Sequence, residues 1–438
     1  MRFSRPRGTR DYIPPETFVR KTVIEKARQV FERYGYSEIV TPAFEYLELL
    51  EAKAGPEIKE QIYWFKDKGG RLLGLRFDLT TSIARVIANN PGIPKPIRFY
   101  YIAPVWRYEE PQKGRLREFW QAGVELIGSP KSEADAEVIA LTYRFFEDLG
   151  LENGLIIKIN SRKIADIIAR KAGIDENEKD TFFRAIDKLY KQGVDKVREE
   201  LGKIGLSEKT INYVIENITI KGDLEEKINK ASKILGETGP LMEVNELVYS
   251  LIEVYDIPEK CIDLDFSIVR GIGYYTGTVF EFMHEKALDL GALAAGGRYD
   301  KLIEILGGVP TPATGMSIGI ERVCELYKRL NKKVIENIPP TTAQVIVIPV
   351  KNEEHLVKTC TKIAERLRKE GFSTIIDVQG RKIRGNLEYA SKLNIPIAII
   401  VGERELTEKR VTVKDLRKYS QESIEMEVLV SKLKEKLL

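Results

Sequence analysis

Residues 98–125, RFYYIAPVWRYEEPQKGRLREFWQAGVE, contain two aromatic, β-prone runs on either side of a polar turn at 109–114. This pattern predicts an antiparallel hairpin with a long loop. Arg107 closes the first predicted strand, and Arg115 and Arg117 open the second. Because planar guanidinium groups pair with phosphate oxygens in a bidentate manner, the hairpin is a candidate anion clamp. A basic hairpin whose charges face water is the alternative.

The second predicted strand adds two polar residues beside these arginines. Gln121 and Glu125 lie four residues apart, a spacing that places both on one face of a strand. A glutamine and a carboxylate next to guanidinium groups suit a zwitterion bound beside a phosphate. Upstream, residues 61–65 and 72–77 predict a strand pair on either side of Gly69 and Gly70. Asp78 and Thr80 sit where the second of these strands gives way to a helix over 81–88. Ligand contact and simple helix capping both explain these two residues.

Two glycine-rich segments further along the chain carry more candidates. In VRGIGYYTG, Arg270 and the pair Tyr274 and Tyr275 lie between two apolar runs, the first of which predicts a strand over 262–269. Glycines let a backbone bend tightly or approach a ligand, so this segment can orient a small polar substrate. A turn with aromatic packing is the alternative. The segment AAGGRYD has a similar composition and contains Tyr299.

The segment GMSIGIER ends in Arg322, in the first turn of a predicted helix. A cation at this position opposes the helix dipole, which an anionic partner such as a polyphosphate readily explains. The chain has neither a Gly-x-x-x-x-Gly-Lys phosphate loop nor a Gly-x-Gly-x-x-Gly fingerprint leading out of a strand.

Length and composition set outer bounds on the protein. A chain of 438 residues is long enough for two to three domains, and its net charge of +4 is too small to indicate nucleic-acid binding by itself. The three cysteines show no metal-ligand spacing and no disulfide framework. The N-terminus has no apolar core of the kind found in signal peptides, and no run reaches membrane-spanning length. We therefore expect a soluble protein of a reducing, cytoplasmic compartment, without membrane partners.

The chain order suggests how the domains are arranged. A helix over 16–34 leads into a strand over 37–42 that ends in proline, an arrangement that can pack against a two-fold copy of itself. A homodimer is thus a hypothesis, and a plain surface helix is the alternative. A capping-box-like start at 132–135 predicts another helix. Residues 162–256 are helical without strand signals, whereas residues beyond 343 alternate strand and helix in the manner of an α/β domain.

Together these motifs resemble a class II aminoacyl-tRNA synthetase, and specifically the histidyl-tRNA synthetase family, over nearly the whole chain. The helix and strand ending at Pro42 are similar to the first motif of that class, Arg107 with Glu109 to the second, and GMSIGIER to the third. The histidine-specific signal lies in LRFDLT, EEPQKGR and VRGIGYY.

The resemblance implies an α+β catalytic domain on an antiparallel sheet, followed by a second domain. The catalytic domain would span 1–330 and be interrupted by a helical insertion at 162–256. A linker at 331–342 would lead to an α/β anticodon-binding domain at 343–438. The family is dimeric, so the resemblance also implies a homodimer.

The resemblance further implies an ATP site. Arg107 would contact the ATP α-phosphate and Arg322 the γ-phosphate, with Arg115 and Glu109 of the hairpin loop also at the ATP. Arg270 would lie between the histidine carboxylate and the α-phosphate. Mg²⁺ would enter with ATP as a substrate complex, and no transition metal bound by the protein is implied.

For the amino acid, the resemblance implies that Asp78, Thr80 and Gln121 hold the histidine α-amino group. Glu125 and Tyr275 would bracket the imidazole, beside Tyr274 and with Tyr299 closing that pocket. Two departures from the family pattern stand out: Gly273 replaces the usual Asp, and Asp78 is one methylene shorter than the Glu of some members.

The activity so implied is that of a histidine–tRNA ligase acting in protein biosynthesis. Such an enzyme activates histidine with ATP to histidyl-adenylate and transfers it to the 3′ end of tRNA(His). One alternative is a synthetase-like regulatory paralogue of histidine biosynthesis, which binds histidine without charging tRNA. Another is a synthetase for threonine or proline with a similar C-terminal module.

Overall fold

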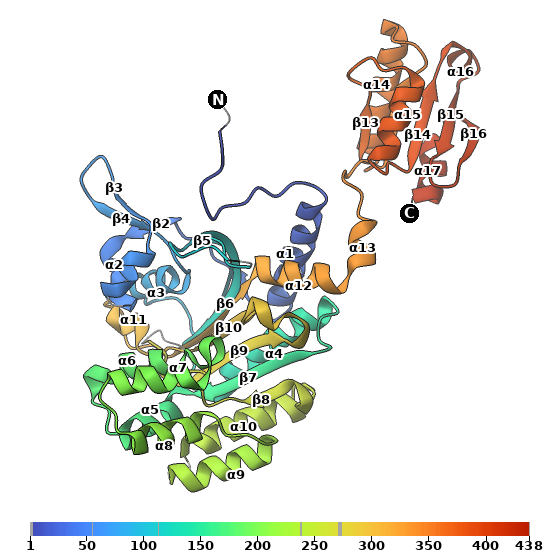
Figure 1. Cartoon of the computed structure of the whole chain (residues 1–438). Helices are drawn as coiled ribbons and strands as arrows, with labels where there is room; N and C mark the ends of the chain where they lie inside the picture. Colours follow the sequence, from blue (N-terminus) through green and yellow to red (C-terminus); the bar gives the residue numbers. More distant parts are fainter. Residues whose placement is uncertain (1–2, 55, 113, 237–238, 270–273, 438) are drawn as a thin grey trace. The chain divides into compact units, whose positions relative to one another are not determined.

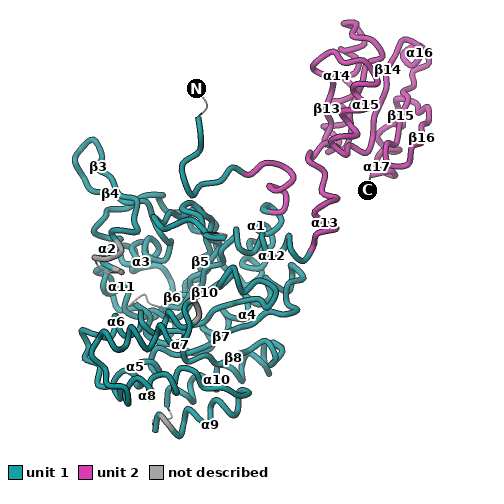
Figure 2. The backbone as a smooth tube through the Cα atoms, in the orientation of Figure 1, with its two compact units in different colours: residues 1–11, 20–330 teal, residues 12–19, 331–438 magenta. Residues whose placement is uncertain are grey.

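The computed structural model describes residues 3–54, 56–112, 114–236, 239–269 and 274–437. The chain falls into two compact units, which Figure 2 shows in different colours. Residues 1–11 and 20–330 form the first unit, and residues 12–19 and 331–438 form the second.

The first unit is built on a twisted sheet of eight strands in the order β1-β5-β6-β11-β10-β9-β7-β8 (Figure 1). The central pairs are all antiparallel, and parallel pairing occurs only at the two edges, between β1 and β5 and between β7 and β8. The predicted α+β fold with an antiparallel core is therefore confirmed. The strand bounds are β1 Ser37–Glu38, β5 Ile97–Trp106, β6 Glu118–Ile127, β7 Leu155–Ser161, β8 Ile262–Leu264, β9 Thr278–His284, β10 Ala294–Arg298 and β11 Ala313–Gly319.

Neighbouring residues of β5 show how the two faces of the sheet are used. Tyr100 points to one face, where its ring packs against Phe31 of α1 (Glu16–Arg33) with 5.6 Å between centroids. On that same face, α4 (Ser132–Asp148) packs against β9 through stacked phenylalanine rings. Tyr101 points to the other face and belongs to a core with α3 (Thr80–Asn89) and α11 (Leu302–Ile305). The first face is therefore closed by long helices, while the second is shared between short helices and a pocket.

A smaller sheet precedes the large one, in the order β2-β4-β3. Its antiparallel β3–β4 pair was predicted from the apolar runs on either side of two glycines, and the pair forms over shorter ranges than predicted. A small core of Leu47, Leu50, Ile62 and Phe77 supports it. The elements are β2 Phe44–Tyr46, α2 Leu47–Ala54, the 3₁₀-helix Pro56–Gln61, β3 Trp64–Lys66 and β4 Leu72–Leu75.

Between β7 and β8 the chain forms a group of helices, shown in green in Figure 1. Three of them begin at side-chain caps, in which Ser161, Ser207 and Asp223 accept hydrogen bonds from backbone N–H groups. Within the described part of 162–256 there is no strand, as the sequence predicts. The helices are α5 Arg162–Lys171, α6 Lys179–Ile186, α7 Leu189–Lys203, α8 Glu208–Ile218, α9 Leu224–Leu235 and α10 Gly239–Glu253.

Two local expectations are wrong. The strand predicted over 262–269 stops at Leu264, because Asp265 turns the chain by accepting hydrogen bonds from the backbone and hydroxyl of Ser267. The helix at Ser132 has no capping box, since Lys131 is its N-cap and Asp135 pairs with Arg298 instead. The segment 331–342, predicted to be a linker, contains the short helix α13 (Lys332–Glu336), which follows α12 (Ile320–Leu330) in the chain.

The second unit contains a five-stranded sheet in the order β13-β12-β14-β15-β16. Its first three strands are parallel and its last two antiparallel, so the predicted parallel or mixed α/β arrangement is mixed. Helices α14 and α17 pack on one face and α15 on the other. The elements are β12 Val345–Pro349, α14 Glu354–Lys369, β13 Thr374–Ile376, α15 Ile383–Lys392, β14 Ile397–Val401, α16 Glu403–Thr407, β15 Arg410–Asp415, β16 Ser420–Glu425 and α17 Leu429–Leu437.

Every helix in the described ranges is too short or too polar to cross a lipid bilayer.

Candidate functional site

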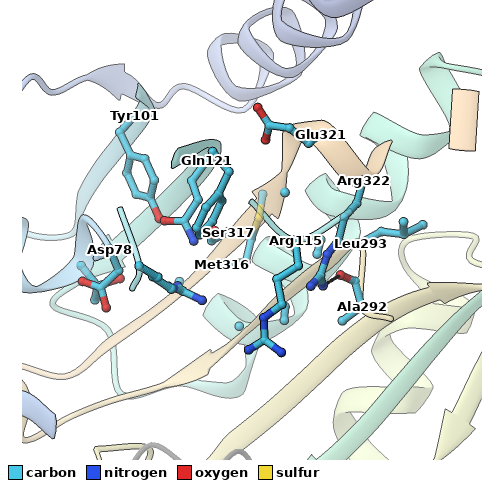
Figure 3. Close-up of a pocket in the computed structure, with 18 of the residues that line it drawn as sticks. Asp78, Tyr101, Arg115, Gln121, Ala292, Leu293, Met316, Ser317, Glu321 and Arg322 are labelled. Carbon is cyan, nitrogen blue, oxygen red and sulfur yellow. Dashed lines mark hydrogen bonds between the residues drawn. The ribbon is translucent and has the colours of Figure 1, made fainter. Parts of the chain in front are cut away.

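A pocket opens on the sheet face that carries Tyr101, over strands β5, β6, β10 and β11 (Figure 3). Its empty volume is about 1060 Å³, which includes the open solvent at its mouth. The predicted site residues that line it are Asp78, Thr80, Arg107, Glu109, Arg115, Gln121, Glu125, Tyr274, Tyr275, Tyr299 and Arg322.

The floor of the pocket needs glycine. A Cβ on Gly315 would lie 1.8 Å from a carboxylate oxygen of Glu125, and one on Gly123 would lie 2.4 Å from the Tyr101 hydroxyl. A Cβ on Gly296 would lie 2.1 Å from the carbonyl oxygen of Gly315. Gly315 and Gly123 therefore leave room for buried polar side chains, and Gly296 lets the backbone of the neighbouring strand come close.

A buried carboxylate marks one end of the pocket. Glu125 is 1% exposed, and its two oxygens accept hydrogen bonds from the Thr80 hydroxyl, at 2.7 Å, and from the Tyr299 hydroxyl. Burial, together with the charge of Glu125, raises the pKa of the Tyr299 hydroxyl well above its usual value. Tyr299 is therefore a protonated donor that fixes the orientation of the carboxylate.

Three tyrosine rings surround this carboxylate end. Tyr274 and Tyr275 lie 4.4 Å apart between ring centroids, and Tyr274 meets Tyr299 edge-on at 5.9 Å. All three rings are buried. Aromatic walls beside a buried carboxylate suit a flat ligand ring that carries an N–H donor.

Asp78 and Gln121 lie next to this end. One carboxylate oxygen of Asp78 accepts hydrogen bonds from the backbone and hydroxyl of Thr81, in the first turn of helix α3, and Asp78 also lines the pocket. The N-cap position itself is taken by Leu79, and contact between Asp78 and a ligand stays a prediction. Gln121 is 7% exposed, and its side-chain oxygen has no hydrogen-bond partner among the described residues. Because buried polar atoms are nearly always paired, this oxygen is available to a ligand donor.

Three arginines mark the other end. Arg322 donates to the carbonyl oxygens of Gly114, at 3.2 Å, and Ala292, at 2.6 Å. Arg107 donates to the carbonyl of Phe77 at 3.1 Å, whereas Arg115 forms an ion pair with Glu109. Figure 3 shows Arg115 and Arg322 on the same side of the pocket.

Arg322 lies among like and opposite charges, since the carboxylates of Glu109 and Glu281 act on it as well as the neighbouring arginines. Burial, and then the nearby guanidinium groups of Arg115 and Arg107, lowers the pKa of Arg322. Since like charges in a buried place repel, a bound anion would relieve this repulsion. The arrangement therefore suits a polyphosphate, as the position of Arg322 in the first turn of α12 also indicates.

The pocket also contains four residues that sequence reasoning did not single out. Tyr101, Phe119, Ser317 and Glu321 all line it. Phe119 could have been found from strand alternation, because it shares a face with Gln121 and Glu125. Glu321 accepts from Arg20 of α1 at 2.6 Å and from the backbone of Trp120 at 2.9 Å, a long-range contact that no sequence pattern signals.

Two sequence candidates cannot be placed. Arg270, expected between the two substrates, and Gly273 lie outside the described residues.

An antiparallel sheet that carries arginines from a hairpin loop and from a strand–helix junction, facing one pocket, is the architecture of a class II aminoacyl-tRNA synthetase. Family comparison narrows the class. The family model described as histidyl-tRNA synthetase matches residues 8–323, and one described as anticodon binding domain matches residues 344–436. The chain belongs to the histidyl-tRNA synthetase family.

The similarity to relatives extends over the whole chain. The histidine–tRNA ligase of Pyrococcus abyssi is 42% identical and covers 99% of both chains. The crystal structure of histidyl-tRNA synthetase from Nostoc sp. PCC 7120 is 30% identical, covers 100% of both chains and has a TM-score of 0.82. A Bacillus halodurans structure titled ATP phosphoribosyltransferase regulatory subunit/histidyl-tRNA synthetase is 25% identical, covers 92% of this chain and 98% of its own, and has a TM-score of 0.71.

Proposed function

We propose that the chain is a histidine–tRNA ligase, which activates histidine with ATP to histidyl-adenylate and transfers it to the 3′ end of tRNA(His). The observation that carries this proposal is that the two ends of one pocket have opposite charges. Arg107, Arg115 and Arg322 lie at one end, and the Glu125–Tyr299 pair lies at the other. Membership of the family supports the same assignment.

Histidine binds at the carboxylate end in this proposal. Glu125 accepts a hydrogen bond from the imidazole, against the ring of Tyr275 and beside Tyr274, with Tyr299 holding the carboxylate. Asp78, Thr80 and Gln121 receive the α-ammonium group, and the unpartnered oxygen of Gln121 supports this role. An analogue without the imidazole donor would leave a buried carboxylate underpaired, which commonly costs about 10⁴-fold or more in selectivity.

ATP binds at the arginine end with Mg²⁺ as its substrate complex. Arg107 contacts the α-phosphate and Arg322 the γ-phosphate, and Arg115 turns from Glu109 towards the phosphates. Glu109 remains at the ATP site. Burial and the neighbouring arginines lower the pKa of Arg322. A bound triphosphate would neutralise these guanidinium groups, which supports the proposed roles.

The chemistry needs positioning more than proton transfer. The histidine carboxylate attacks the α-phosphorus in line, forming a P–O bond while the bond to the pyrophosphate oxygen breaks. A carboxylate is already a nucleophile, so no general base is required. Arg107 and Arg270, the latter on the evidence of sequence resemblance alone, stabilise the charge that develops on the phosphate oxygens. The terminal ribose hydroxyl of the tRNA then attacks the activated carbonyl, and AMP leaves.

The wider arrangement follows from the family. The catalytic domain comprises 1–330 with the helical insertion at 162–256, and residues 343–438 bind the anticodon of the tRNA, consistent with the family match over 344–436. The enzyme works as a cytoplasmic homodimer in which α1 contributes to the interface.

Histidine-dependent ATP–pyrophosphate exchange tests the proposal. We expect exchange with histidine and none with threonine or proline, followed by charging of tRNA(His). A paralogue that only regulates histidine biosynthesis would bind histidine but give no exchange. A synthetase for another amino acid would respond to that amino acid, and either result would overturn the assignment.

A further inference from the structure

The junction between β7 and α5 holds the chain segment that leads towards the tyrosines of the pocket. Asn160, fully buried at the end of β7, donates from its side-chain amide to the carbonyls of Phe266, at 3.2 Å, and Ile268, at 2.9 Å. The backbone N–H of Asp265 donates to the carbonyl of Ile159 at 3.0 Å. The stretch after β8 is therefore fixed against the end of β7, the strand next to the edge of the sheet.

Arg162, the first residue of α5, holds both sides of the next stretch. Its guanidinium donates to the carbonyl of Val269 at 3.3 Å, and its backbone N–H donates to the carbonyl of Gly277 at 2.8 Å. Tyr274 and Tyr275 lie between these two points and line the pocket. One residue thus contacts the chain at Val269, before the two tyrosines, and at Gly277, just before β9.

The same guanidinium also contacts the helical group. Its carbon lies 3.6 Å from the ring centroid of Phe183 in α6, a close cation–π contact. Arg162 is only 7% exposed, and its nearest carboxylate oxygens, on Asp180 and Asp166, are 3.9 and 4.0 Å away. Burial lowers the pKa of Arg162. A buried cation with only distant carboxylates depends on the ring and the carbonyl for its stabilisation.

We propose that Arg162 is a positioning residue for the amino-acid end of the pocket, which transmits the placement of α6 to Tyr274 and Tyr275. It touches neither substrate and acts through the backbone at Val269. The inference rests on the proposed function, because that function assigns Tyr274 and Tyr275 to the histidine pocket. It gives the helical insertion a role in amino-acid activation, before any tRNA is bound.

The test measures the kinetics of histidine-dependent ATP–pyrophosphate exchange for the full chain and for the variants Arg162→Lys, Phe183→Leu and both together. Lysine keeps the charge but loses the planar group that both stacks and donates. We expect the KM for histidine to rise about tenfold in Arg162→Lys, because small misplacements of binding groups are costly. The KM for ATP should stay unchanged, because Arg107, Arg115 and Arg322 lie on other segments, whereas kcat should also fall, because Arg270 directly follows Val269 in the sequence.

Phe183→Leu should raise the histidine KM less, and the double variant should resemble Arg162→Lys, because the two residues act through one contact. Lys227→Met is a matched control. Lys227 also reaches from the helical group to the sheet, where it pairs with Asp263 and donates to the carbonyl of Leu264 at 2.9 Å, and both partners lie before the segment that Arg162 holds. It should leave the histidine KM unchanged.

A second readout does not depend on activity. Amide hydrogen exchange over 274–282 should become faster in Arg162→Lys and not in Lys227→Met. A purely structural role would lower the melting temperature without a selective change in the histidine KM, and that result would overturn the inference. Failure of the proposed function would look different, because the unmodified protein would then show no histidine-dependent exchange at all.

Discussion

The two ends of the pocket are stabilised in opposite ways. At the carboxylate end, Glu125 is bound by the side chains of Thr80 and Tyr299, so side chain holds side chain. At the arginine end, Arg107 and Arg322 are held by main-chain carbonyls. The first end is a closed hydrogen-bond network, and the second brings together three guanidinium groups.

This difference shows how one site can serve two unlike substrates. Backbone carbonyls orient the guanidinium groups while leaving most of their charge for a phosphate. A carboxylate whose partners are fixed side chains accepts only a ligand with a matching donor. We infer that affinity for the triphosphate is set mainly by charge at one end, and that choice of amino acid is set by geometry at the other.

Removing charge from the arginine end should have the largest effect. In Arg322→Met we expect kcat for exchange to fall about 10²–10³-fold, because a preorganised charge on the triphosphate is lost. Histidine binding, measured by calorimetry without ATP, should be unchanged. Arg329→Met is the control, since Arg329 lies on the same helix and pairs at the surface with Asp289. An equal loss in both variants would contradict a specific role for Arg322.

Breaking the carboxylate end should have the reverse signature. We expect Glu125→Gln to raise the KM for histidine about 10²-fold, because an amide is a weaker acceptor and a buried donor is left poorly paired. The KM for ATP should not change. Glu118→Gln, on the same strand but exposed, serves as the comparison. If Glu125→Gln raised the KM for ATP as much as the KM for histidine, the two ends would not be independent.

The sequence predicted which residues of one strand share the pocket, but not the contacts between residues far apart in the chain. Strand alternation placed Gln121 and Glu125 on one face, and the pocket contains both, because a period of two follows directly from backbone geometry. The hydrogen bond between Glu125 and Tyr299 spans 174 residues, and no local pattern encodes it. The hydrogen bond between Arg20 and Glu321 was missed because it also joins residues far apart in the sequence.

Local errors in the fold have local causes. The strand predicted to reach residue 269 ends early because the Asp265 side chain satisfies the backbone of Ser267, a turn that apolar periodicity does not reveal. Asp135 was assigned to a cap, but its carboxylate is used by Arg298 from a distant strand. In both cases one side-chain hydrogen bond outweighed a pattern of several residues.

A smaller change sharpens the account of the carboxylate end. Tyr299→Phe keeps the ring and removes only the hydroxyl that donates to Glu125. We expect the histidine KM to rise about tenfold, the effect of one lost hydrogen bond to a charged group. Steady-state exchange at varied histidine concentration measures it. An unchanged KM would mean that Tyr299 does not orient the carboxylate.

The smallest expected effect is a dependence of stability on pH. The fold raises the pKa of Tyr299 above its ordinary value of 10.0, so the folded state binds its proton more tightly than the unfolded state. The stability it contributes is complete below pH 10 and is lost as the pH rises towards the folded pKa. Melting temperatures from pH 8 to 11 should therefore fall more steeply for the unmodified protein than for Tyr299→Phe. Parallel curves would contradict the raised pKa.

The most direct measurement is a crystal structure with histidinol and ATP, since histidinol lacks the carboxylate that reacts. We predict an imidazole nitrogen within about 3 Å of a Glu125 oxygen, and triphosphate oxygens at similar distances from Arg107 and Arg322. An imidazole bound away from Glu125, or a triphosphate that meets neither arginine, would contradict the assignment of the two ends.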